Sequence, residues 1–231
     1  MDERLWNACT ESAALLDYVA TFASASQLRW MACGFVRRHW PLLRFVRQQN
    51  AIRFAERWAA GQANGEDGPA LLESLQLDAI NAPMFETHLF QAAVDVLQES
   101  ALEAARLCRE RMIQHAAQEA AYETPPGSNE SRYIQQARVA ESHGQCDVVR
   151  EIIANPFRPL SLQRHWLRHQ DGAAAHLLLL IRSEQRFTDL AILADALEDA
   201  GCSEQALLEH LRQPQGHLGG CWALEALHAL L

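Results

Sequence analysis

The spacing of apolar residues constrains the fold of this chain more than any other feature of its sequence. Apolar side chains recur three and four positions apart along nearly the whole chain, as Leu15, Val19 and Phe22 do. This spacing places them on one face of an α-helix, whereas no stretch of useful length alternates as a β-strand would. The sequence therefore predicts an all-α fold with a helical bundle. Its first three helices are expected over residues 10–22, 27–39 and 45–61, with Ser26 as the cap of the second and a break near Pro41.

A long helical hairpin is expected in the middle of the chain. No glycine or proline interrupts the stretch from about Pro83 to Tyr122, which allows one helix of about 38 residues, roughly 57 Å long. The segment 124–129, Thr-Pro-Pro-Gly-Ser-Asn, then allows the chain to reverse its direction. A second helix over 133–153, kinked near Gly144, would complete the hairpin.

The rest of the chain is predicted to form a small bundle of four short helices. Asn155-Pro156-Phe157-Arg158-Pro159 is a rigid connector, so we expect one domain over 1–155 and another over 156–231. Short connectors make neighbouring helices antiparallel, and the segment 173–181, apolar on most sides, is expected to be the central buried helix. The four helices are expected over residues 172–182, 187–200, 203–212 and 218–231.

The charged residues exclude several functions and are unevenly distributed. All 20 basic residues are arginine, so mechanisms that need a lysine, such as a P-loop or a Schiff base, are excluded. The net charge is −9, yet the first 60 residues carry eight arginines and five acids, while residues 61–125 carry three arginines and eleven acids. The predicted hairpin is therefore acidic, and only the first quarter of the chain could attract a polyanion.

The remaining composition predicts a reduced, cytoplasmic protein. The six cysteines contain no Cys-x-x-Cys pair, and the start Met-Asp-Glu-Arg lacks the pattern of a signal peptide. The longest apolar run, 177–181, is far shorter than the roughly 20 residues that span a bilayer, so no membrane segment is expected. No motif of a nucleophile or a phosphate loop is present, and we expect neither catalysis nor a cofactor.

Arginines and aromatic residues are interleaved in the second and third predicted helices. Arginine can bind phosphate and aromatic rings can stack on bases, as in single-stranded nucleic-acid binding. The aromatic residues nevertheless recur at core-like spacing, and the acidic segment that follows could pair with the arginines, so nucleic acid is the less favoured ligand. The candidate binding residues are Arg37, Arg38, Arg44, Arg47, Arg53 and Arg57.

A group of histidines and cysteines near the C-terminus contains residue types that zinc accepts. Cys202 and His210 would lie at opposite ends of one helix, roughly 12 Å apart, too far for one ion. His217 and Cys221 are four residues apart at a helix start, so His210, His217 and Cys221 remain as a possible three-ligand set. The favoured interpretation is that the cysteines are small core residues and that no metal is bound.

Two further groups have spacings that could be functional. His165 and His169 are four residues apart, but Trp166 stands where a metalloprotease motif has glutamate, so a partly exposed turn anchored by Trp166 is favoured. Asp195, Glu198 and Asp199 could present paired carboxylates, yet a solvated helix face is favoured, with an ion pair from Asp195 to Arg182 or Arg186 as an intermediate reading.

Several segments together resemble a paralogous bacterial protein family that is abundant in planctomycetes. They are Trp6-Asn7-Ala8-Cys9-Thr10, residues 28–43 with Ala32-Cys33 and Arg37-Arg38, Ala55-Glu56-Arg57-Trp58-Ala59, residues 155–159, Trp166, residues 193–202 and residues 217–222. The resemblance covers nearly the full length and implies a shared fold and lineage, but no activity. The chain departs from the family pattern at three places. Phe35 and Val36 stand where the pattern has two cysteines, Leu211 stands where it has one cysteine, and Gly219 also differs.

These observations favour a non-catalytic interaction or scaffold module. The acidic hairpin and the arginine-rich helix would present complementary charged faces to a protein partner or to a second copy of the chain. One alternative is a metal- or ligand-binding protein that uses His210, His217 and Cys221. The other is nucleic-acid binding through the arginine-rich N-terminal helices.

Overall fold

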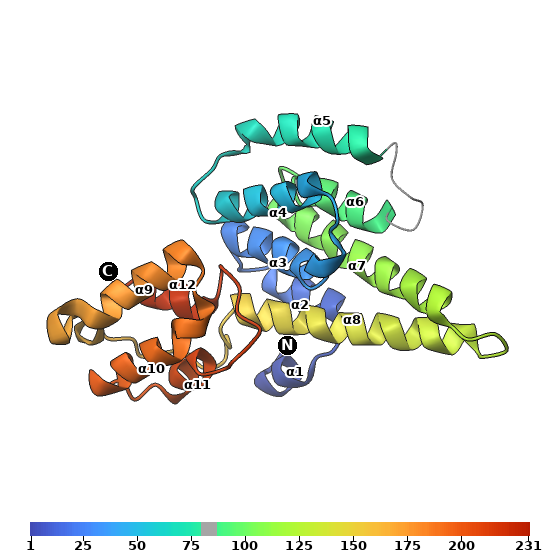
Figure 1. Ribbon diagram of the computed structural model, residues 1–231. Coiled ribbons are helices and arrows are strands. Elements are labelled where there is room, and N and C mark those ends of the chain that lie inside the picture. Colours follow the sequence, from blue (N-terminus) through green and yellow to red (C-terminus); the bar gives the residue numbers. More distant parts are fainter. Residues whose placement is uncertain (80–86) are drawn as a thin grey trace. The chain divides into compact units, whose positions relative to one another are not determined.

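The computed structural model describes residues 1–79 and 87–231, with the side chains of 1–75 and 87–231. Every regular element in these ranges is a helix, which confirms the all-α prediction (Figure 1). The chain divides into two compact units, residues 1–150 and 151–231, where the sequence had suggested a boundary after 155. Among the described helices, none combines the length and the apolar character needed to cross a bilayer.

Unit 1 is built around the helix α3 (Ala25–Arg37), whose residues from Leu28 to Val36 are all buried. A capping box of Ser24 and Gln27 begins α3, two residues before the predicted cap; Ser26 instead donates to the carbonyl of Ala59 at 2.5 Å. The expected break follows in a 3₁₀ turn, Trp40–Leu42. The other helices of the unit are α1 (Glu3–Ala8), α2 (Ser12–Val19), α4 (Val46–Ala59), α5 (Gly68–Ala79), α6 (Thr87–Asp95), α7 (Ala101–Glu123) and most of α8 (Glu130–Ile152).

The predicted hairpin is formed by α7 and α8, each 23 residues long and joined by the Pro-Pro-Gly turn. The prediction of a single helix over 83–122 is wrong, because residues 87–122 form two separate helices, α6 and α7. Residues 83–86 lie outside the described ranges. The side chain of Ser100 accepts a hydrogen bond from the Glu103 N–H and starts α7 anew. The second helix is unkinked at Gly144, where a Cβ would collide with the guanidinium of Arg38. Gly144 therefore makes room for a packed side chain and does not bend the helix.

The break between α6 and α7 is held by Arg29, which is 4% exposed. Its guanidinium donates to the carbonyl oxygens of Val96, Gln98 and Glu99 at 2.9–3.1 Å and lies 3.5 Å from the centre of the Trp58 ring. These carbonyls follow the end of α6, where no further helical turn supplies N–H donors to them. Because the buried guanidinium of Arg29 donates to these carbonyls, it stabilises the break relative to one uninterrupted helix.

Replacing Arg29 with Met is expected to lower the free energy of unfolding by about 3 kcal/mol, because three backbone carbonyls beside the buried Arg29 side chain lose a charged donor. Urea unfolding of the full chain measures the change. Arg53→Met is the matched control, since Arg53 is exposed and its guanidinium lies over the Trp40 ring at 5.3 Å. Its cost should stay below about 1 kcal/mol. Equal losses in the two variants would contradict the role of Arg29.

Unit 2 contains the four short helices that the sequence predicts. They pack around a core that includes Leu178, Leu193, Leu207 and Leu224. The expectation that the first of them is buried on most sides is wrong: only Ala174, Leu178 and Ile181 are buried, and Leu179 is 45% exposed. The helices are α9 (Ala173–Glu184), α10 (Leu190–Asp199), α11 (Gln205–Leu211) and α12 (Trp222–His228), preceded by 3₁₀ turns at Arg164–Arg168 and Gln170–Gly172.

Candidate metal centre

Among the candidate arginines, Arg37 and Arg38 form side-chain ion pairs with described residues of unit 1. Arg37 makes a bidentate pair with the carboxylate of Glu56 at 2.6 and 2.7 Å, and Arg38 contacts the carboxylate of Glu141 at 3.3 Å. These are internal ion pairs of the kind that the sequence favours over a nucleic-acid surface. The others contact unit 1 as follows: Arg47 the carbonyl of Ser74, Arg53 the ring of Trp40, Arg57 the ring of Phe54, and Arg44 the lining of a cavity.

The carboxylates of α10 also take part in ion pairs. Asp195 and Glu198 both accept from the guanidinium of Arg212, at 2.8 and 2.6 Å, and not from the arginines that the sequence suggested. His165 and His169 are exposed in and beside the 3₁₀ turn that Trp166 anchors in the core. Neither group gathers the donor atoms that a metal ion needs.

Four potential metal ligands do converge in unit 2: His210, His217, Cys221 and Glu151. His210 lies in the last turn of α11, His217 in the loop that follows, Cys221 at the N-cap of α12, and Glu151 in the last turn of α8, where unit 2 begins. One donor atom from each lies within 4.8 Å of the donors of the other three. The sequence had indicated the first three; Glu151 is far away in the chain and carries no local signal.

The distances between the donor atoms are near those around a tetrahedral ion, though more widely spread. His210 Nε2 lies 3.1 Å from Cys221 Sγ and 3.3 Å from a Glu151 oxygen, and His217 Nδ1 lies 3.3 Å from the other Glu151 oxygen and 4.0 Å from Cys221 Sγ. A zinc ion about 2.0–2.3 Å from each donor would place the donors roughly 3.3–3.6 Å apart. Small shifts of the side chains would therefore admit the ion.

Backbone groups behind the cluster orient its donors. His217 Nε2 lies 3.0 Å from the carbonyl of Gln213, an acceptor for the Nε2 proton; a metal ion that replaces the Nδ1 proton would then meet the Nδ1 lone pair. The Leu218 N–H donates to a Glu151 oxygen at 3.2 Å. Metal ligands in proteins commonly have such second partners.

The cluster is buried and strongly polarised. Burial would raise the pKa of Glu151, but hydrogen bonds from His210 and His217 outweigh it and lower the pKa to about 2. Burial acts against protonated His217, yet Glu151 raises the pKa of this imidazole. Burial, with the Glu151 charge, raises the pKa of the Cys221 thiol well above its usual range. A divalent cation among these groups would replace their protons and stabilise the thiolate.

The arrangement does not match a nucleophilic relay of cysteine, histidine and acid. Such a relay needs one ring nitrogen on the thiol and the other on the carboxylate. In this cluster the same Nε2 of His210 faces both Cys221 and Glu151, so the lone pairs converge on one point. Convergence of this kind suits a metal ion better than proton transfer along a chain of groups.

No family model, curated protein or solved structure matches this chain. The geometry of the cluster therefore carries the functional argument by itself.

Proposed function

We propose that this protein binds one zinc ion through Glu151, His210, His217 and Cys221. The observation that carries the proposal is the convergence of four donor atoms, on buried or half-buried residues, within 4.8 Å of one another. Two imidazoles and a thiolate are ligands that zinc prefers, and a carboxylate is a common fourth. Because the protein supplies all four ligands, no position is left for a substrate, and the centre is structural.

A structural ion fits the construction of unit 2. Its helices α11 and α12 have only seven residues each, too few to be stable without tertiary support. The ligands belong to α11, to the loop before α12, to the N-cap position of α12 and to the end of α8. One ion would fasten these four segments to one another.

Purified without a histidine tag, the full chain is expected to contain one zinc ion, measured by elemental analysis. Cys221→Ser should weaken zinc binding at least about tenfold, because a hydroxyl is a poor replacement for a thiolate. Cys202→Ser is the matched control, since Cys202 is another buried cysteine of unit 2 outside the cluster. Zinc retained by Cys221→Ser, or a wild-type chain that takes up none after incubation with zinc, contradicts the proposal.

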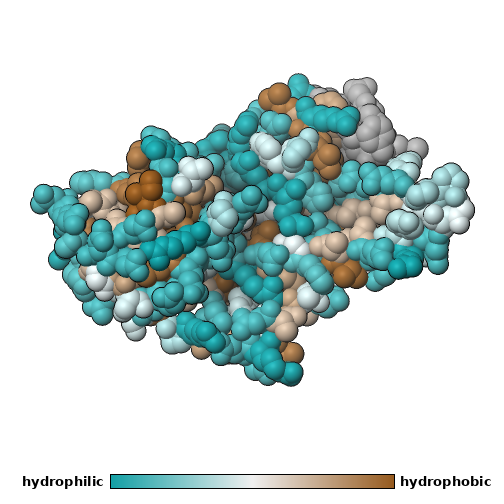
Figure 2. All heavy atoms as spheres, turned by 60° about the horizontal axis from the view of Figure 1, so that its bottom comes forward, coloured by the Kyte–Doolittle hydropathy of each residue, from teal (hydrophilic) through white to brown (hydrophobic). Residues whose placement is uncertain are grey.

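A second candidate function is the interaction module that the sequence favours, and one observation supports it. Two tyrosines near the turn of the acidic hairpin are open to solvent, Tyr122 at 71% and Tyr133 at 42%. On the face shown in Figure 2, hydrophilic residues predominate and hydrophobic residues form small separate patches. Exposed aromatic residues are typical of contact surfaces. The partner, the nucleic-acid alternative and membership of the planctomycete family all stay predictions.

A further inference from the structure

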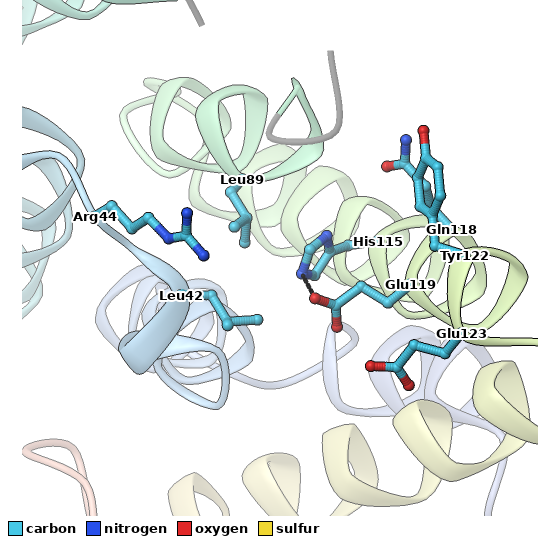
Figure 3. Close-up of a pocket in the computed structure, with 8 residues that line it drawn as sticks. All are labelled: Leu42, Arg44, Leu89, His115, Gln118, Glu119, Tyr122 and Glu123. Carbon is cyan, nitrogen blue, oxygen red and sulfur yellow. Dashed lines mark ion pairs between the residues drawn. The ribbon is translucent and has the colours of Figure 1, made fainter. Parts of the chain in front are cut away.

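A cavity of about 330 Å³ lies in unit 1, apart from the metal centre. It opens between the 3₁₀ turn Trp40–Leu42, the helix α6 and the last turns of α7. Figure 3 shows Leu42 and Arg44 reaching in from one side and His115 and Glu119 from α7 on the other. Its volume is at the lower end of the range of small-molecule sites, which indicates a ligand of one or two rings.

Two polar groups that line this cavity make no hydrogen bond to any described residue. The side chain of His115 is only 4% exposed, and neither of its ring nitrogens makes a hydrogen bond within the described part of the chain. The nearest carboxylate oxygen, on Glu119, is 3.6 Å from Nε2, too far for one. The side-chain oxygen of Gln118 is also buried without a partner among these residues. Such groups cost about 1–3 kcal/mol each, so a ligand that bonds to them gains that energy.

These groups define the hydrogen bonds that a ligand must make. Burial and the neighbouring His39 and His88 lower the pKa of His115 to about 4, so its ring is neutral at pH 7. A neutral imidazole offers one N–H donor and one acceptor, and the amide oxygen of Gln118 offers an acceptor only. The complementary ligand therefore presents an N–H group beside an acceptor nitrogen or oxygen.

The rest of the lining restricts the charge and the shape of the ligand. Leu42 and Leu89 supply apolar surface, and the ring of Tyr122 stands at the edge (Figure 3). Glu119 and Glu123 both line the cavity, against a single guanidinium from Arg44. The excess of carboxylates disfavours phosphate and carboxylate ligands and favours neutral or cationic ones.

We propose that this cavity binds a small planar nitrogen heterocycle with an exocyclic amino group, the chemical class that includes free nucleobases. The amino group donates to the amide oxygen of Gln118, and the adjacent ring nitrogen accepts from the N–H of His115. The flat ring lies against Leu42 and Leu89. A free base suits this cavity better than a nucleotide does, because the negative charge of a phosphate would be repelled by the carboxylates of Glu119 and Glu123.

Isothermal titration of the full chain tests the proposal with adenine and 2-aminopyrimidine as probes. Both are expected to bind with dissociation constants below about 1 mM at pH 7. Adenosine monophosphate and benzoate carry the disfavoured negative charge and should bind at least about tenfold more weakly. Equal binding of benzoate would overturn the proposed class of ligand, and no binding by either heterocycle would overturn the site.

Variants on α7 locate the bound heterocycle. Gln118→Leu removes the acceptor and should weaken adenine binding about fivefold to tenfold, which corresponds to one hydrogen bond. Gln114→Leu, one turn earlier on α7 and outside the cavity lining, is the matched control and should leave it unchanged. His115→Phe should weaken binding at least as much, provided that circular dichroism shows wild-type helix content. Unchanged affinity in Gln118→Leu would contradict the assignment whatever the histidine variant does.

Discussion

Removing zinc from the loaded protein is expected to speed amide hydrogen exchange in α11 and α12 by about a thousandfold. An ion present at a thousand times its dissociation constant stabilises the folded state by about 4 kcal/mol, and a chelator takes that energy away. The effect should concentrate there because His210 lies in the last turn of α11 and Cys221 occupies the N-cap position of α12. Exchange of the full chain, followed by mass spectrometry with and without chelator, measures it.

The comparison that makes this result specific is internal to the molecule. Amides of α3 in unit 1 lie in another compact unit and contribute no ligand, so their exchange should change far less. Glu151→Gln keeps the shape of the side chain but removes its charge, and exchange in this variant should respond only weakly to the chelator. Equal exchange rates in the loaded and stripped wild-type protein would show that the cluster holds no structural ion.

The helices were predictable because their apolar stripes are local features of the sequence. A residue contacts the core through the face set by the 3.6-residue period, so Leu28 to Val36 could be assigned to a helix without any knowledge of its neighbours. The interruption between α6 and α7 depends instead on Arg29, which comes from a different helix. Local patterns cannot report a partner that only the tertiary structure brings near.

The same distinction applies to the candidate metal centre. His210, His217 and Cys221 lie within one short stretch, where helix geometry alone could test their spacing and reject Cys202. Glu151 enters from the end of the hairpin, and its sequence neighbours look like those of any helix end. The signal that could have found it was the burial of an acid, since a buried carboxylate needs partners. The burial of one acidic residue cannot be predicted from a single sequence.

Acidification is expected to destabilise the wild-type chain more than a His115→Gln variant. The pKa of this histidine is about 4 in the folded protein, against about 6.5 in an unfolded chain. The unfolded state therefore binds the proton more tightly, so the contribution of His115 to stability is complete above pH 6.5 and is lost as the pH falls toward 4. Between pH 7 and pH 4, this difference between the two pKa values lowers the free energy of unfolding of the wild type by about 3 kcal/mol.

The groups around His115 explain why its proton is disfavoured. Burial acts first, and the rings of His39, centred 5.3 Å away, and of His88 add repulsion, while Glu141 opposes the shift only in part. Urea unfolding at pH 7, 5.5 and 4 measures the effect as the difference between wild type and His115→Gln, which cancels the contributions of other groups. His143→Gln on the exposed side of α8 is the matched control and should follow the wild type. If wild type and His115→Gln lose the same free energy on acidification, His115 is not held neutral, and the hydrogen-bonding pattern assigned to the cavity loses its basis.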